Sequence, residues 1–97
     1  MPVYITLLNY TQQGVENMKE SPARLERARE AIRAAGGKMH AFYLTMGQYD
    51  AISISEAPSD EVYAATLLAI AAGGAVRTET LRAFTEDEYR EIIASLP

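Results

Sequence analysis

Two glycine pairs divide this sequence into alternating strand-like and helix-like segments, and the order of those segments limits the fold more than any other feature. Gly36–Gly37 and Gly73–Gly74 each follow a stretch with the spacing of a helix, and glycine is common just after a helix's last turn. β-branched and aromatic residues alternate with others before and after these stretches, which is typical of strands. The order predicted is therefore strand, helix, strand, strand, helix, strand.

The bounds of these elements follow from capping residues and alternation. The predicted strands are residues 3–10, 38–46, 49–57 and 75–84, and residues 11–20 are expected to form a loop or a single irregular turn. Ser21 is the expected N-cap of the first helix, and Ser59 or Asp60 that of the second. Thr85 and Glu88 have capping-box spacing, which predicts a short third helix at the C-terminus.

This order predicts one α+β domain over residues 1–97, with the ferredoxin-like plan β-α-β-β-α-β and a C-terminal helix. The sheet is expected to be antiparallel, with both main helices on one face and the other face bare. A chain of 97 residues buries only about 60–65% of its unfolded surface, and 48% of its residues are hydrophobic. We therefore expect a homo-oligomer, with two sheets packed face to face.

Composition excludes several classes of function. The net charge of −4 and the pI near 4.9, without a basic cluster, argue against nucleic acid as a partner. The chain has no cysteine, which excludes disulfides, thiolate chemistry and Cys-ligated metal sites. Its longest apolar run, "VYAATLLAIAAGGAV", is too short for a bilayer, and its first residues have the pattern of a strand instead of a signal peptide. No membrane partner and a cytoplasmic location are expected.

The stretch "LTMGQYDAISISEAPSD", with the later "VRTETLRAFTEDEY", resembles the GYD-domain family of small bacterial proteins, and the likeness extends over nearly the whole chain. The glycine, tyrosine and aspartate that name the family correspond to Gly47, Tyr49 and Asp50, with Gln48 inserted. The resemblance implies a ferredoxin-like fold of the dimeric α/β-barrel kind. It implies no particular activity and no cofactor.

A weaker resemblance links the same hairpin and "GAVRTETLRAF" to the effector-binding domain of the Lrp/AsnC regulators. Those domains oligomerise and bind amino acids between subunits. No segment of the sequence has the pattern of the DNA-binding helix-turn-helix of such regulators, so a regulator of that kind is not expected. The resemblance therefore implies effector binding or assembly, without DNA.

Gly47, Tyr49 and Asp50 have two interpretations. In the structural one, Gly47 adopts a positive φ in a hairpin, Tyr49 packs, and Asp50 accepts hydrogen bonds from backbone amides. In the functional one, the phenol and the carboxylate bind a ligand at a subunit interface. Alternation predicts that Tyr49 and Asp50 begin the third strand on opposite faces of the sheet.

Other polar residues of the strands are further candidates for a ligand site. Asn9 ends an otherwise apolar row and either caps a loop or points into a pocket, and Arg77 either joins an ion pair or binds a ligand carboxylate. Three further candidates are His40, Tyr43 and Glu79. His40 is the only histidine, so a metal site is not expected; alternation places it on the face of Phe42.

No phosphate loop, dinucleotide fingerprint, HExxH or GxSxG motif occurs in the chain. The function expected is therefore a non-enzymatic, homo-oligomeric module for small-molecule binding or assembly, with no cofactor. The alternative is a small cofactor-free or haem-using enzyme of the dimeric α/β-barrel type, with a cleft near His40, Tyr49 and Asp50. That alternative depends on analogy between folds alone.

Overall fold

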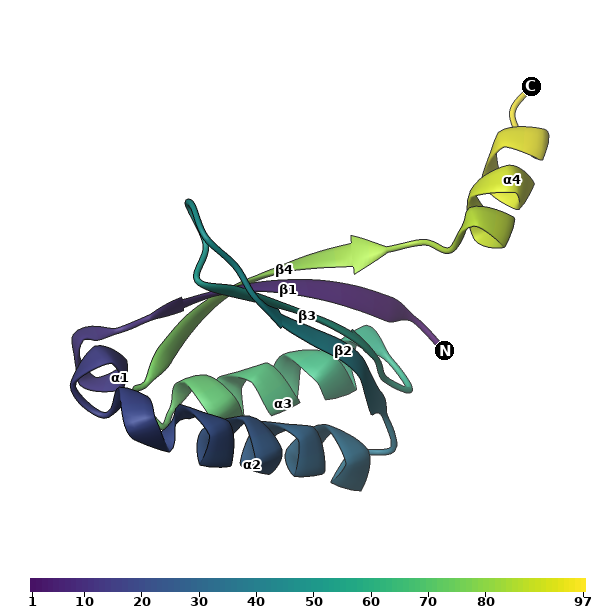
Figure 1. Cartoon of the computed structure of the whole chain (residues 1–97). Helices are drawn as coiled ribbons and strands as arrows, with labels where there is room; N and C mark the ends of the chain where they lie inside the picture. Colours follow the sequence, from purple (N-terminus) through teal and green to yellow (C-terminus); the bar gives the residue numbers. More distant parts are fainter.

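A computed structural model describes all 97 residues and contains the predicted four-stranded sheet (Figure 1). The strands are β1 (Val3–Tyr10), β2 (Lys38–Leu44), β3 (Ala51–Glu56) and β4 (Val76–Ala83). Their order in the sheet is β2-β3-β1-β4, and every neighbouring pair is antiparallel. The predicted α+β, ferredoxin-like plan is confirmed.

Helices α2 (Ser21–Ala34) and α3 (Asp60–Ala71) lie side by side under one face of the sheet (Figure 1). The side chain of Ser59 accepts a hydrogen bond from the amide of Val62 at 3.2 Å, so Ser59 is the cap of α3. Gly36 and Gly74 follow the two helices with φ angles of 90° and 82°, the left-handed conformation that glycine adopts most easily. The glycine pairs therefore end both helices as predicted.

The segment predicted as a loop or a single turn forms two short helices, α1 (Gln12–Glu16) and η1 (Met18–Glu20). Thr11 caps α1, since its hydroxyl accepts a hydrogen bond from the amide of Gly14 at 3.2 Å. Gly14 is buried, and a Cβ atom at this position would lie 2.2 Å from the carbonyl oxygen of Ala75. The close approach to Ala75 explains why the segment has a glycine here.

The connection between β2 and β3 is longer than the short turn that the sequence predicted. β2 ends at Leu44 and β3 begins at Ala51, and Thr45 donates hydrogen bonds to the carbonyls of Asp50 (2.9 Å) and Tyr49 (2.7 Å) across the base of the loop. Gly47 has the expected positive φ, 120°. Tyr49 and Asp50 thus belong to the loop, and the prediction that they begin β3 on opposite faces of the sheet is wrong.

The core between sheet and helices is small and partly polar. The rings of Tyr4 and Tyr63 stack with centroids 4.2 Å apart, and the hydroxyl of Tyr63 lies 2.8 Å from that of buried Thr6. Tyr4 also donates a 2.6 Å hydrogen bond to Asp60. Burial and this hydrogen bond raise the pKa of Tyr4 to about 12.

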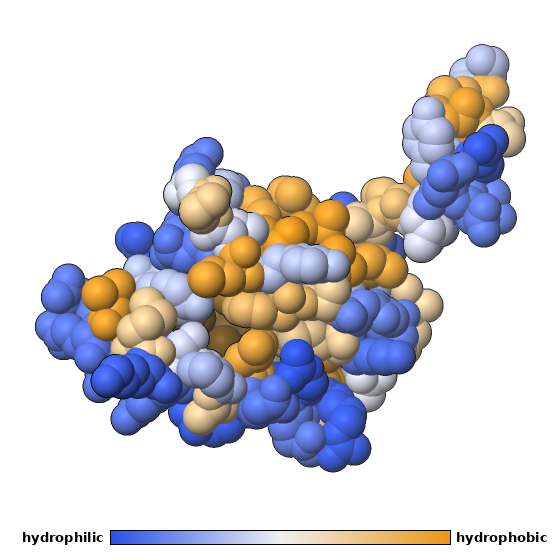
Figure 2. Space-filling model, in the orientation of Figure 1, coloured by the Kyte–Doolittle hydropathy of each residue, from blue (hydrophilic) through white to orange (hydrophobic).

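The opposite face of the sheet, which we call the open face, is uncovered. The strand register places Ala41, Ile54, Ile5 and Leu81 in one row across it, and Leu81 is 49% exposed. Apolar residues are visible on this upper side of the molecule in Figure 2. Such a contiguous apolar surface is uncommon on a monomer.

Helix α4 (Glu86–Ala94) stands away from the sheet and the other helices (Figure 1). Thr85 and Glu88 form the predicted capping box at its start. Tyr89, Ile92 and Ile93 have the spacing i, i+3, i+4 on α4, and Leu96 follows just beyond its C-cap, Ser95. All four are exposed, and we call them the α4 stripe. None of the helices is long and apolar enough to cross a membrane.

Candidate functional site

Asp50 and Asn9 meet at the end of the sheet where β1 leaves it. One carboxylate oxygen of Asp50 accepts a hydrogen bond from the amide of Tyr10 at 2.9 Å. The amide of Asp50 donates to the carbonyl of Leu8 at 2.9 Å and to the side-chain oxygen of Asn9 at 3.2 Å. The pairing of β1 with β3 ends at Leu8 and Ala51, so the Asp50 carboxylate takes the place of the next carbonyl in that ladder.

Tyr49 reaches from the loop to β4. Its hydroxyl donates a hydrogen bond to the carboxylate of Glu79, and this bond raises the pKa of Tyr49. Arg77 is exposed, lies opposite Asn9 in the strand register and shares the open face with Glu79. The sequence therefore identified residues that do come together, at one end of the sheet.

The contacts of this group correspond to the structural interpretation. Asp50 and Asn9 bind backbone amides, and Tyr49 has Glu79 as its partner. No cavity is lined by any of them. Ligand binding at Asn9, Gly47, Tyr49, Asp50 and Arg77 stays a prediction.

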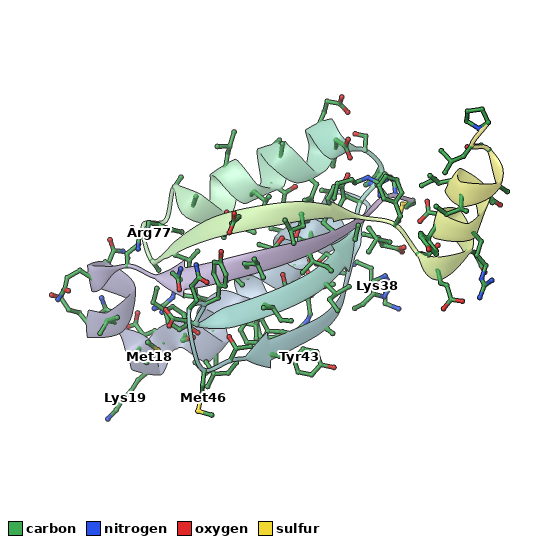
Figure 3. All side chains as sticks on the ribbon, turned by 90° about the horizontal axis from the view of Figure 1, so that it is seen from above. Met18, Lys19, Lys38, Tyr43, Met46 and Arg77 are labelled. Atoms are coloured by element: carbon green, nitrogen blue, oxygen red, sulfur yellow. The ribbon has the colours of Figure 1, made fainter.

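His40 and Tyr43 lie on edge strand β2, far across the sheet from Arg77 on edge strand β4; Figure 3 labels Tyr43 and Arg77. The register of β2 shifts between Met39 and Ala41, and such a bulge breaks the two-residue alternation. The imidazole of His40 consequently lies 3.5 Å from the carboxylate of Glu56. Phe42 lines the cavity on the helix side of the sheet, so the prediction that His40 shares the face of Phe42 was wrong. No group of three His, Asp or Glu side chains could hold a metal ion.

The largest cavity, of about 460 Å³, lies between the sheet and helices α2 and α3, and its opening is visible as a hollow in Figure 2. Thr6, Ser53 and Tyr63 lie in its lining, together with Arg24 and Arg27 of α2. None of the residues predicted from the sequence lines it. Small residues at inward positions of strand and helix were the one signal that could have indicated it, since they leave volume unfilled.

Comparison with known proteins agrees with the fold and with the Gly47, Tyr49 and Asp50 motif. The family model described as GYD domain matches residues 4–93. The chain belongs to the GYD-domain family.

A protein from Thermus thermophilus is 32% identical to this GYD domain over 84 residues, which are 86% of this chain and 88% of the relative. That protein is named glutamine synthetase and cystathionine beta-lyase binding protein. A crystal structure of a protein from Thermus thermophilus superimposes with a TM-score of 0.57 at 23% identity, over 88% of this chain and 95% of the other. The structural likeness supports the fold.

Proposed function

We propose that this GYD domain is a non-enzymatic, homo-oligomeric assembly module that pairs with itself through the open face and binds partner proteins through α4. The observation that carries the proposal is the pair of uncovered apolar surfaces, the open face and the α4 stripe. The enzyme alternative is not favoured, because the cavity is lined by none of His40, Tyr49 and Asp50. A bacterial, cytoplasmic setting is part of the proposal.

A second copy fits the open face because the face is apolar in its middle and carries both charges at each end. Lys38 and Glu56 are paired in register at one end, and Arg77 lies at the other, with Glu79 one row nearer the middle. Two such faces related by a two-fold axis bury their apolar rows and avoid placing charges of only one sign together. Face-to-face packing of sheets is a common way to cover an apolar sheet face.

Light scattering after size-exclusion chromatography tests the self-pairing. We expect the wild-type chain to be a dimer at micromolar concentration and Leu81→Asp to be a monomer, because the substitution places a charge in the apolar row that the paired faces would bury. Leu68→Asp is the matched control, since Leu68 is 73% exposed on α3, away from the open face. A monomeric wild type, or a Leu81→Asp dimer as stable as the control, would refute the pairing.

The α4 stripe is the proposed surface for partner proteins. An amphipathic helix with exposed anchors at this spacing is a recurrent peptide-recognition element, and Ile92 and Ile93 are 44% and 48% exposed. The named partners of the 32% identical relative supply the first proteins to test. These are glutamine synthetase and cystathionine β-lyase from the same organism as this chain.

Surface plasmon resonance with each immobilised enzyme is the measurement. We expect saturable binding by the wild type and at least a tenfold loss in Ile92→Asp, with Glu91→Gln unchanged because residue 91 lies outside the stripe. Binding that Ile92→Asp and Glu91→Gln leave equal would show that α4 is not the surface used. No binding to either enzyme would remove these two proteins as partners.

A further inference from the structure

The cavity under the sheet has the properties of a small-molecule site, and it lies on the opposite side of the sheet from the proposed interface. Its volume of about 460 Å³ is within the range of about 300–1,000 Å³ that ligand sites occupy. Fifteen of its 25 lining residues are hydrophobic, so most of a bound molecule would have apolar surroundings. Ala28 and Ala31 of α2 and Ala69 of α3 leave the space open.

The arginines of α2 differ according to whether they line this cavity. Two of them have a carboxylate partner three residues earlier on the helix, in the pairs Glu26–Arg29 and Glu30–Arg33. The other two, Arg24 and Arg27, line the cavity and have no ion-pair partner. Arg24 donates only to two backbone carbonyls, at 2.9 and 3.4 Å. Arg24 keeps further N–H donors beyond these two bonds, and Arg27 makes no side-chain hydrogen bond, so neither guanidinium group has a carboxylate partner within the chain.

The charge balance of the lining indicates a ligand with one negative charge. Glu20 is the only acidic residue among the lining residues, so Arg24 and Arg27 leave one positive charge in excess. A planar guanidinium group matches a carboxylate better than it matches most other anions of single charge. Ser53 and Thr78 add neutral hydroxyl groups on the strands.

We propose that the cavity binds a small apolar carboxylic acid. Its hydrocarbon part lies between the sheet and the helices, and its carboxylate lies at the guanidinium groups of Arg24 and Arg27. This binding does not depend on the pairing of open faces or on α4. The site is also separate from the loop that carries Gly47, Tyr49 and Asp50.

Isothermal titration of the full chain with decanoate, 1-decanol and the decyltrimethylammonium cation tests the proposal. We expect decanoate to bind at one site per chain about tenfold more tightly than decanol, a difference of about 1.4 kcal/mol, and the cation not to bind. Arg27→Gln should weaken decanoate about tenfold and leave decanol unchanged. Arg33→Gln is the matched control and should change neither, because Arg33 lies outside the cavity and is paired with Glu30.

Variants that fill the cavity locate the bound molecule. Ala31→Leu and Ala69→Leu enter the cavity from its two helical walls and should each abolish decanoate binding; Ala69 is exposed, so its variant is expected to fold. Circular dichroism checks the fold of both. Any of three results would overturn the proposal. The first is full decanoate binding by a folded Ala69→Leu variant, and the second is equal affinity for decanoate and decanol. The third is the lack of saturable binding at 1 mM decanoate, a concentration ~1,000-fold above a micromolar Kd.

Discussion

Replacement of Asp50 by alanine should destabilise the sheet, because the carboxylate continues the ladder between β1 and β3 by one bond. Its oxygen accepts the amide of Tyr10 at 2.9 Å, and in Asp50→Ala that half-buried amide loses its partner. A hydrogen bond to a charged group contributes about 1.5–3 kcal/mol. Since both residues are only half-buried, we expect a loss of about 1–2 kcal/mol in the free energy of unfolding.

Asp50→Asn is the informative comparison. The asparagine side chain keeps an acceptor oxygen at the same place and loses only the charge, so it should cost less than half as much as alanine. Asp87→Ala controls for the removal of an acid, because Asp87 lies in the exposed first turn of α4. Asp50→Ala should therefore be the only one of the three with a large loss.

Urea unfolding followed by circular dichroism measures these differences, at one protein concentration, because the stability of an oligomer depends on concentration. A loss of this size corresponds to a fall of about 5–15 °C in Tm for a domain of this length. Asp50→Ala with the stability of the wild type would refute the structural role. That result would instead favour the functional interpretation, in which Tyr49 and Asp50 bind a ligand.

Three further predictions concern the packing, the pH dependence and α4. Gly14→Ala should prevent folding or lower the free energy of unfolding by more than about 3 kcal/mol, as measured by urea unfolding, because its Cβ would lie 2.2 Å from a carbonyl oxygen of Ala75. The pKa of Tyr4 is raised to about 12, so its contribution to the free energy of unfolding should be complete below pH 10 and lost between pH 10 and 12. Alkaline unfolding of Tyr4→Phe should lack about 1 kcal/mol of this pH dependence; the value is small because solvent screens exposed Asp60, the hydrogen-bond partner of Tyr4. Thr85→Ala should speed hydrogen exchange of the α4 amides severalfold, because a lost cap costs about 1 kcal/mol; unchanged exchange would contradict this.

Most of the fold could be predicted because it depends on local signals. The glycine pairs, Ser59 and the capping box of Thr85 and Glu88 each act within a few residues, and their order allows few topologies. The bulge beside His40 could not be predicted, because a register shift is decided by pairing with another strand. The longer loop before β3 could not be predicted for a similar reason, since Asp50 bonds to Tyr10 and Leu8, 40 and 42 positions earlier in the chain.

The residues of the candidate site could be predicted from the sequence, but their contacts could not. Tyr49 and Asp50 were identified from the hairpin motif, and Asn9 and Glu79 as polar residues of the strands. Tyr49 contacts Glu79, and Asp50 contacts Asn9. Whether such groups are free or satisfied depends on partners distant in sequence, and the pattern of residues alone does not contain that information. The cavity was missed for the related reason that its lining comes from many elements that are far apart in the chain.

The sequence by itself determined the family, the order of the elements, the caps of α3 and α4 and the excess of apolar surface, whereas the predicted cap Ser21 is the first residue of α2 and makes no capping hydrogen bond. These properties follow from composition and from interactions between residues close together in the chain. Only the tertiary structure decided which apolar surfaces remain uncovered, that Asp50 extends the sheet, and that the arginines of α2 divide into paired ones and ones that line a cavity. The physical reason is that burial, hydrogen-bond satisfaction and cavity volume are set by contacts between segments far apart in sequence.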